Sequence, residues 1–452
     1  MISLHSNPGE RPHVVVLGAG FGGLAVARAL TGKDVDVTIV DKRNHHTFQP
    51  LLYQVATAGL DSNDVASSVR GIFHRASNIS VRQGEVIGID FESQTIRIRD
   101  GEHLAYDYVV LALGAVTADF GVPGVDDFAF GLKDVAEASS IRDHILTNFE
   151  LATRVDGDST KTTVVVVGGG PTGVEMAGGL AELIDRVLVH DFPELDRSDM
   201  AVVLVEAGEN VLGGFQDRLR NTATSTLRKM GVDVRLNLGV AEVDARGVLL
   251  SNGERIDSET VIWAAGVRAH PLVEVLELET ERGRVSIDAH LRATGQPRVF
   301  AIGDLAATPD GEGGLVAQVA AVAVQGGEHV AKTILAENGL GELPKPFRYL
   351  DRGSMATIGR NAAVVEFPNG WTIRGFPGWV AWLGLHLTHL IGVRNRASVF
   401  VNWAWNYLTY DRGSRAVVTG LEHREIADER DKRSELSSKL GEERPSESGA
   451  TP

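Results

Sequence analysis

Two glycine-rich segments contain the residues whose types and spacing point most directly to chemistry. The first is Gly18-Ala19-Gly20-Phe21-Gly22-Gly23, after the apolar run His13–Leu17, and the second is Gly168-Gly169-Gly170-Pro171-Thr172-Gly173, after Thr163–Val167. Both fit the pattern G-x-G-x-x-G, whose glycines permit a tight turn and let the backbone approach a pyrophosphate. The phosphates then meet free N–H groups and the positive end of a helix dipole. The chain is therefore predicted to hold two dinucleotides, an arrangement suited to moving electrons between them.

One acidic residue completes each segment. Asp41 ends the run Val35–Val40, and Glu206 follows a run that ends at Val205. Asp41 lies at about the distance at which a carboxylate binds ribose hydroxyls, roughly 20 residues beyond the glycines. Glu206 lies farther from its glycines, after a longer helix and the polar insertion His190–Asp199, and is predicted to play the same role. The alternative is a solvated acid at a strand end. Glu206 is followed by Ala207-Gly208-Glu209, with no arginine to receive a 2′-phosphate, so NADH is predicted in preference to NADPH.

The elements around these segments alternate between strand and helix. Expected helices are Leu24–Leu30, Val174–Val189 and Leu315–Leu335, and the first two each join a pair of apolar runs in a βαβ unit. Such units predict an α/β fold with parallel sheets. Further strands are expected at Ile79–Ile89, Thr95–Arg99, Tyr108–Leu113, Val232–Leu236, Val248–Leu250, Val261–Trp263 and Val299–Ile302. The second unit is predicted to lie within the first domain, because the last of these strands resembles a return to the first sheet.

Composition excludes several classes of function. The 452 residues contain no cysteine and carry a formal net charge of −16. The absence of thiols removes disulfide chemistry and iron–sulfur clusters, and no metal site is predicted. A strongly acidic chain lacks the basic footprint that nucleic acid requires. Met1–Arg11 has no apolar signal core, so a cytoplasmic location is expected.

Three more motifs indicate which dinucleotide each loop binds. They are Val109-Val110-Leu111-Ala112-Leu113-Gly114, Val261-Ile262-Trp263-Ala264-Ala265-Gly266 and Phe300-Ala301-Ile302-Gly303-Asp304. Small residues at a strand end let a loop cross close to a nucleotide, and an acid after a buried strand can bind a ribityl hydroxyl or cap a helix. With the two loops, these motifs resemble the two-dinucleotide-binding-domain flavoproteins.

The resemblance implies that the first loop binds FAD and the second binds NADH. The residues implied for FAD are Gly18, Gly20, Phe21, Gly22, Gly23, Asp41, Lys42, Arg43, Thr47, Val86, Ala112, Gly114, Gly303, Asp304 and Ala317. Those implied for NADH are Gly168, Gly170, Pro171, Thr172, Gly173, Glu206, Ala265 and Gly266. Disulfide reductases and sulfide:quinone reductases of this fold use cysteines, and this chain has none.

A narrower resemblance is to the type II NADH:quinone oxidoreductases. It rests on His45-His46-Thr47-Phe48-Gln49-Pro50-Leu51-Leu52-Tyr53-Gln54-Val55-Ala56, on Arg352-Gly353-Ser354-Met355-Ala356-Thr357-Ile358-Gly359-Arg360, and on the Trp-rich stretch that follows. The resemblance implies that hydride passes from NADH to the flavin, that two electrons pass to a quinone, and that no ions are pumped. It places Glu175 near the nicotinamide and flavin; the alternative is an acid that stabilises a helix N-terminus.

The family usually carries A-Q-x-A-x-Q near the flavin and quinone, and this chain departs from it. Gln318 and Gln325 are the candidate catalytic glutamines, seven positions apart rather than four. Seven residues span about two helical turns, so both could share one face of the predicted helix. The alternative is a pair of polar groups on a helix packed beside FAD.

The C-terminal region is aromatic and nearly free of acidic residues. Residues 376–410 are predicted to bind a membrane surface, because Phe400, Trp403, Trp405, Tyr407 and Tyr410 surround a polar stripe of Ser398, Asn402 and Asn406. Arg394, Arg396, Arg412 and Arg415 could meet anionic headgroups. His386 and His389 are interpreted as polar-stripe residues. A dimer interface or an ordinary core helix is the alternative.

The predicted organisation is α/β, with two Rossmann-like dinucleotide-binding domains, for FAD and NADH, and a C-terminal membrane-associating segment. The FAD domain is expected at residues 1–130 and 286–345, the NADH domain at 131–285, the membrane and dimerisation region at 346–420, and a charged tail at 421–452. A peripheral homodimer on the cytoplasmic face of the plasma membrane is expected. Two other functions stay open: a soluble NAD(P)H:acceptor flavin reductase and a flavin-bearing redox sensor.

Overall fold

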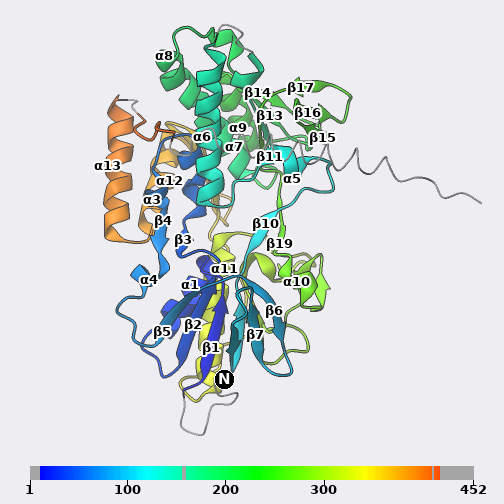
Figure 1. Ribbon diagram of the computed structural model, residues 1–452, viewed down its shortest axis with the longest axis vertical. Helices are drawn as coiled ribbons and strands as arrows, with labels where there is room; N and C mark the ends of the chain where they lie inside the picture. Colours follow the sequence, from blue (N-terminus) through cyan, green and yellow to red (C-terminus); the bar gives the residue numbers. More distant parts are fainter. Residues whose placement is uncertain (1–10, 155–158, 410–411, 418–452) are drawn as a thin grey trace, which may run out of the picture.

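The computed structural model describes residues 11–154, 159–409 and 412–417. Two lobes lie one above the other along the long axis (Figure 1). The lower lobe contains a five-stranded parallel sheet in the order β22 (Val299–Ala301), β9 (Tyr108–Leu111), β1 (His13–Leu17), β2 (Asp36–Asp41) and β5 (Ile79–Gln83). The upper sheet is also parallel, in the order β11 (Ala129–Phe130), β18 (Thr260–Trp263), β12 (Thr163–Val167), β13 (Ala201–Val205) and β14 (Asp233–Arg235).

Four strands follow the same order in both sheets, β9-β1-β2-β5 below and β18-β12-β13-β14 above, and the edge strand β22 returns to the first sheet beside β9. This confirms the predicted α/β fold with two Rossmann-like parallel sheets. The chain enters and leaves the upper lobe through an antiparallel pair, β10 (Ala115–Thr117) and β19 (Val267–Ala269). Leu272 and Val285 then pack in one core with Val15 of β1. That part of the chain belongs to the lower lobe, although the NADH domain was predicted to extend to residue 285.

Helices cover both sheets. In the lower lobe α1 (Phe21–Leu30) and α11 (Ala320–Glu337) pack together so closely that a Cβ at Gly327 would lie 2.6 Å from the Gly22 carbonyl oxygen. The upper lobe uses α6 (Val135–Ala152), α7 (Pro171–Leu183) and α9 (Asp217–Lys229). Small antiparallel sheets flank the lobes: β6 (Val86–Asp90), β7 (Thr95–Ile98) and β8 (His103–Ala105) below, and β15 (Val240–Asp244), β16 (Gly247–Leu250) and β17 (Arg255–Asp257) above.

Two predicted elements differ from the structure. The run Ile79–Ile89 is not one strand: β5 joins the parallel sheet, and β6 joins the antiparallel one after Gly84. The predicted helix Leu315–Leu335 begins only at Ala320, the first residue of α11. Gln318 therefore precedes the helix, and the expectation that it shares a helical face with Gln325 is wrong.

The C-terminal region follows with three antiparallel strands and two helices. The strands are β23 (Ser354–Gly359), β24 (Ala362–Glu366) and β25 (Thr372–Gly375), and the helices are α12 (Phe376–His389) and α13 (Val393–Thr409). β23 lies against α7, where a Cβ at Gly178 would be 1.7 Å from the Ile358 carbonyl oxygen. α12 and α13 lie along one side of the molecule (Figure 1). Tyr410 and the charged tail at 421–452 lie outside the described residues.

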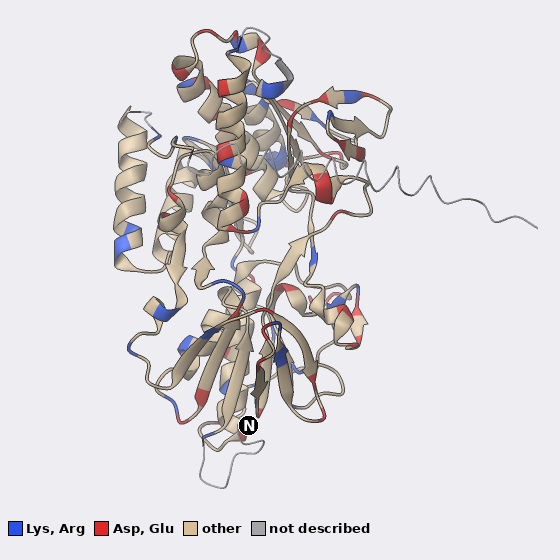
Figure 2. Ribbon diagram, in the orientation of Figure 1, with Lys and Arg blue, Asp and Glu red and all other residues tan. Residues whose placement is uncertain are grey.

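The polar stripe of α13 faces the protein. Ser398 and Asn402 both donate hydrogen bonds to Asp64, at 2.6 and 2.9 Å, and Asn406 donates to the Gly59 carbonyl oxygen. The opposite face is apolar and exposed, with Phe400 59%, Trp405 58% and Leu408 77% exposed. Figure 2 shows α13 without acidic residues and with its basic residues at one end.

Three residues assigned to the membrane surface are engaged elsewhere. Trp403 is half-buried and donates its indole N–H to Gln54. Arg412 bonds to the Thr57 carbonyl oxygen at 2.6 Å and pairs with Glu182, while Arg415 pairs with Asp191. The prediction of a headgroup contact is therefore wrong for Arg412, whose side chain is 13% exposed, while Arg415 is partly exposed and Arg394 and Arg396 are exposed. Among the described residues, no helix is both long and apolar enough to cross a bilayer.

Candidate functional site

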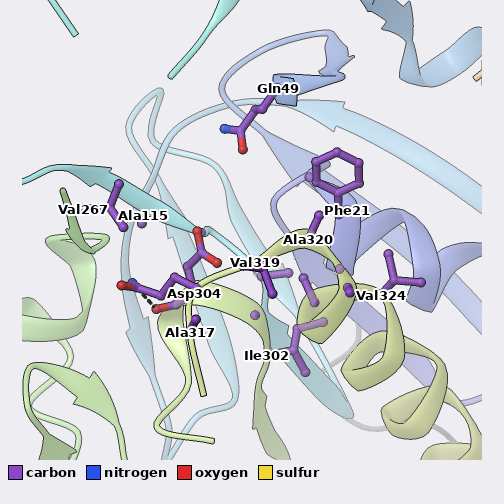
Figure 3. A pocket seen from close by; sticks show the side chains of 18 of the residues that line it. Phe21, Gln49, Ala115, Val267, Ile302, Asp304, Ala317, Val319, Ala320 and Val324 are labelled. Carbon is purple, nitrogen blue, oxygen red and sulfur yellow. Dashed lines mark hydrogen bonds between the residues drawn. The ribbon is translucent and has the colours of Figure 1, made fainter. Parts of the chain in front are cut away.

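A cavity of about 2270 Å³ lies where the strands of both sheets end. The segments after β1, β9 and β22 line it from the lower lobe, and those after β12 and β18 line it from the upper lobe. Ligands of open parallel sheets bind at this carboxyl edge. Figure 3 shows Phe21, Gln49, Asp304 and Val324 around one common space. The fold thus brings residues from distant parts of the chain to a single site.

The first glycine loop has the geometry of a phosphate cradle. Gly18 has φ +104°, and a Cβ there would lie 2.4 Å from the Ala112 carbonyl oxygen. A Cβ at Gly23 would lie 1.9 Å from the Gly18 carbonyl oxygen, so both positions require glycine. At Gly20 an added Cβ meets no atom within 4 Å, although the residue lines the cavity. No side chain caps the helix that begins at Phe21, so its free N–H groups remain for an anion.

Asp41 ties this loop to the end of β2. Its carboxylate accepts hydrogen bonds from the N–H groups of Ala19 and Arg43, each at 2.7 Å. Asp41, Lys42, Arg43, Thr47 and Val86 all line the cavity. The Arg43 guanidinium pairs with Asp134, the N-cap residue of α6.

Asp304 lines the lower-lobe part of the cavity, directly after β22. Burial raises the pKa of its carboxyl, and the nearby charges of Lys133 and Arg284 act in the opposite direction. Gln318 donates to the Asp304 carbonyl oxygen at 2.9 Å and accepts from Arg284 at 3.1 Å. The Gln318 amide is thus satisfied at both ends, although the residue lines the cavity beside Ala317.

Gln325 is satisfied in a similar way. Its side chain donates to the Leu350 carbonyl oxygen at 3.0 Å and accepts from the Leu350 N–H at 2.9 Å. Both candidate glutamines therefore line the cavity with their amides already bonded to protein, which restricts what either can offer to a substrate.

The second loop repeats the geometry of the first. Gly168 has φ +108°, a Cβ at Gly173 would lie 1.8 Å from the Gly168 carbonyl oxygen, and a Cβ at Gly170 would meet no atom within 4 Å. Glu206 accepts hydrogen bonds from the Gly169 and Gly208 N–H groups, as Asp41 does in the lower lobe.

This loop also borders a smaller cavity of about 450 Å³, which is lined by Glu206, Glu209, Asn210 and Arg220 among others. Arg220 was missed in the sequence because it comes from α9, and no local signal marks it. It pairs with Asp217.

Nearly all of the predicted site residues meet in the large cavity. Of the full set, Gly23, Gly168, Gly173 and Glu206 alone do not line it; the three glycines shape the loops, and Glu206 lines the smaller cavity. Ala112, Gly114 and Gly303 line the lower-lobe part, and Pro171, Thr172, Ala265 and Gly266 line the upper-lobe part.

The cavity also reaches the C-terminal region. The part of its wall formed by Phe48, Tyr53, Glu175, Leu385 and His386 is called the arm. Glu175 of α7 lines this arm, and its Oε1 accepts a hydrogen bond from the Thr357 N–H of β23 at 3.2 Å. Burial raises the pKa of this carboxyl to about 8, so the acid is neutral at pH 7. Phe48, Gln49, Tyr53, Leu385, His386 and His389 also line the cavity.

The two histidines were interpreted as polar-stripe residues, and the structure instead places them at the cavity wall. Burial lowers the pKa of His386 to about 4, so its imidazole is neutral. His386 stacks on Trp382 with ring centroids 4.0 Å apart. The sequence marked Tyr53 only as part of the segment His45–Ala56 and His386 only as a polar-stripe residue, and it gave no sign that the two line one cavity, because the elements that carry them are far apart in the chain.

Comparison with known proteins agrees with this geometry. Residues 12–327 match the pyridine nucleotide-disulphide oxidoreductase family, and residues 352–410 match the NDH2 C-terminal domain. The type II NADH:quinone oxidoreductase NdhA of Mycobacterium tuberculosis is 39% identical over 433 residues, which cover 91% of each chain. The type II NADH:quinone oxidoreductase of Staphylococcus aureus is 31% identical over 370 residues, covering 78% of this chain and 89% of that relative.

Among solved structures, NDH2 from Plasmodium falciparum in complex with NADH superposes with a TM-score of 0.83 at 21% identity, covering 91% of this chain and 100% of that one. At this identity the likeness supports the fold. Together with the identity to the curated relatives along most of the chain, it leads to one conclusion: this chain belongs to the type II NADH:quinone oxidoreductase family.

Proposed function

We propose that this protein oxidises NADH and reduces a membrane quinone by two electrons, with FAD on the first glycine loop and NADH on the second. The observation that carries the proposal is the single cavity that joins both loops to the arm containing Glu175. One cavity lets the three reacting groups meet without electron transfer over a long distance. Mixing NADH and then a short-chain quinone with the anaerobic protein tests it: flavin absorbance should bleach in the first step and return in the second.

The residues present fit FAD. The open space at Gly20 accommodates a pyrophosphate, the free N–H groups of α1 favour its charge, and Asp41 lies where a ribose would bind. Asp304 and Lys133 also line this cavity, and their carboxyl and ammonium groups would hold the hydroxyl groups and ring oxygens of the rest of FAD. When bound, FAD supplies two-electron transfer between a nicotinamide and a quinone.

The second loop is proposed to hold NADH through Glu206. Replacing Glu206 by Ala should raise the KM for NADH by about tenfold or more, because the side chain both fixes Gly169 and Gly208 and faces the smaller cavity. Steady-state kinetics with NADH as the varied substrate measures the change, and the KM for quinone serves as the control. An unchanged KM for NADH would contradict the ribose assignment.

The arm beside Glu175 is proposed to receive the quinone headgroup. Reduction of a quinone to a quinol takes up two electrons and two protons. A hydride equivalent from the bound, reduced flavin carries both electrons and one proton, and the neutral Glu175 can supply the other proton and regain it from water. Its Oε1 accepts a hydrogen bond from the Thr357 N–H, which holds the carboxyl in place beside β23. The neutral His386 ring adds no charge to the arm. A cavity wall made of apolar and uncharged polar side chains is suited to an uncharged quinone headgroup.

The exposed apolar face of α13 is proposed to bind the membrane, on its cytoplasmic side, as a peripheral attachment. Ser398, Asn402 and Asn406 bond to Asp64 and Gly59, so the outward face presents mainly the large apolar side chains Phe400, Trp405 and Leu408 to water. The exposed Arg394 and Arg396 lie at the end of the helix where anionic headgroups could meet them. A homodimer through the same region is the second proposed use of this face.

Replacing Trp405 by Asp should lower the fraction of protein bound to anionic vesicles by about tenfold, because a carboxylate replaces an exposed ring on the apolar face. NADH:ferricyanide activity should stay at the wild-type level. Vesicle flotation measures the binding, and Trp371→Asp is the matched control, since Trp371 is 75% exposed on the β24–β25 turn. Equal flotation of both variants would argue against membrane binding through α13.

A further inference from the structure

The side chain of Tyr53 is a buried phenol at the wall of the proposed quinone arm. It lies on α2 (Leu52–Ala56), is 9% exposed and lines the cavity together with Glu175. Its ring lies edge-on to Trp382 at 6.2 Å, and on α7 a Cβ at Gly179 would be 3.3 Å from it. Burial first, and the proximity of Glu175 second, raise the pKa of this phenol well above its ordinary value. Tyr53 therefore keeps its proton at every physiological pH.

A short hydrogen-bond chain from α13 fixes the direction of that proton. The indole of Trp403 can only donate, and its N–H donates to Gln54 Oε1 at 2.7 Å. The Gln54 amide is thereby oriented with its NH₂ toward Tyr53, and Nε2 donates to the phenol oxygen at 2.8 Å. The phenol oxygen is thus an acceptor for Gln54. Within the part of the chain that the structure describes, the Tyr53 hydroxyl has no acceptor for its own proton.

We propose that Tyr53 donates a hydrogen bond to a carbonyl oxygen of the quinone, and that Gln54 and Trp403 are positioning residues that hold the phenol in this donor direction. The proposal rests on the quinone arm proposed above. A donor aimed at the carbonyl oxygen stabilises the negative charge that develops there as electrons arrive. It also connects the arm to α13, because the residue that orients the chain belongs to the helix with the exposed apolar face.

Three substitutions remove the donor in different ways. Tyr53→Phe deletes the hydroxyl and keeps the ring. Trp403→Phe keeps an aromatic side chain beside Trp382 and frees the Gln54 amide to turn its oxygen toward the phenol. Gln54→Glu places a carboxylate that accepts from both neighbours and so captures the Tyr53 proton. Tyr108→Phe is the matched control, since Tyr108 also accepts an amide hydrogen bond, from Asn338, and does not line the cavity.

The experiment measures kcat and KM for a short-chain quinone, NADH:ferricyanide activity and Tm for each flavin-loaded variant. We expect Tyr53→Phe and Gln54→Glu to lower kcat/KM for quinone by about tenfold, with a smaller loss for Trp403→Phe and none for Tyr108→Phe. Ferricyanide activity should not change. The double variant Tyr53→Phe/Trp403→Phe should lose no more than Tyr53→Phe alone, because both changes act through one hydroxyl.

Wild-type quinone kinetics in Tyr53→Phe, or additive losses in the double variant, would overturn the proposal. Equal losses of ferricyanide and quinone activity would also overturn it, since they indicate a structural role. If Tyr53→Phe does not fold, Gln54→Glu and Trp403→Phe carry the test with the phenol in place. Leu385→Trp, which narrows the arm, separates the two proposals: a quinone defect there with normal Tyr53→Phe kinetics rejects the tyrosine and keeps the arm. Normal kinetics in both rejects the arm.

Discussion

Replacing Glu175 by Gln is expected to lower quinone turnover at pH 7 by about 100-fold, which is typical of losing a general acid. The buried carboxyl has a pKa of about 8 and is therefore protonated at pH 7, whereas an amide cannot transfer a proton. NADH:ferricyanide turnover should stay near the wild-type level, because ferricyanide takes up an electron without a proton. Parallel steady-state assays with the two acceptors measure the difference.

The pH profile makes this prediction sharper. Because burial raises the pKa of Glu175, its acid form is present below about pH 8 and is lost as the pH rises through that value. Wild-type quinone reduction should fall over this range, and the Glu175→Gln variant should show a low rate without that decline. Glu274→Gln serves as a control on an exposed acid. If the rate of quinone reduction still falls with rising pH in the Glu175→Gln variant, the decline is due to another titrating group.

Replacing Gly23 by Ala is expected to abolish NADH oxidation and flavin retention, with a loss greater than about 100-fold. The new Cβ would lie 1.9 Å from the Gly18 carbonyl oxygen, so the loop and α1 must separate. Because backbone atoms lie on both sides of this contact, it cannot be relieved by a side-chain rotation, and a backbone shift costs much more free energy. Flavin absorbance of the purified protein and NADH:ferricyanide activity measure the loss.

Two further alanine variants distinguish loss of flavin binding from loss of the fold. Gly20→Ala adds a methyl group to open cavity space, so it should weaken flavin binding while the apoprotein keeps its Tm. Gly341→Ala, where nothing lies within 4 Å of the added atom, should behave as wild type. Full flavin content in Gly23→Ala would mean that the first loop does not form the cofactor site.

Local sequence was sufficient for the two nucleotide loops and the sheets that carry them. A strand, a tight turn and a helix N-terminus are built from neighbouring residues, and steric limits at Gly18 and Gly168 admit little other than glycine. Asp41 ends β2 and Glu206 directly follows β13, so the place of each acid at the edge of its sheet follows from the βαβ unit, whereas its distance along the chain depends on the length of the connecting segment. The repeated strand order then follows from the duplication that is visible in the chain.

The glutamines illustrate where periodicity fails. The pattern around Gln318 and Gln325 is compatible with one helix, yet α11 begins only at Ala320, and Gln318 donates to the Asp304 carbonyl oxygen and accepts from Arg284. The backbone just before is bonded elsewhere, because the Val316 N–H donates to the Thr308 carbonyl oxygen and not to a helical turn. No local pattern encodes the partner, so the start of the helix could not be predicted.

The sequence by itself determined the two loops, their acids, the α/β class and the presence of an amphipathic C-terminal helix. Only the tertiary structure decided that the polar stripe of that helix faces Asp64, that Arg412 reaches Glu182, and that Glu175 and Tyr53 meet at one arm of the cavity. Periodicity states which residues share a face, because that depends on helical geometry alone. It does not state which face is buried, because burial depends on elements that lie far away in the chain.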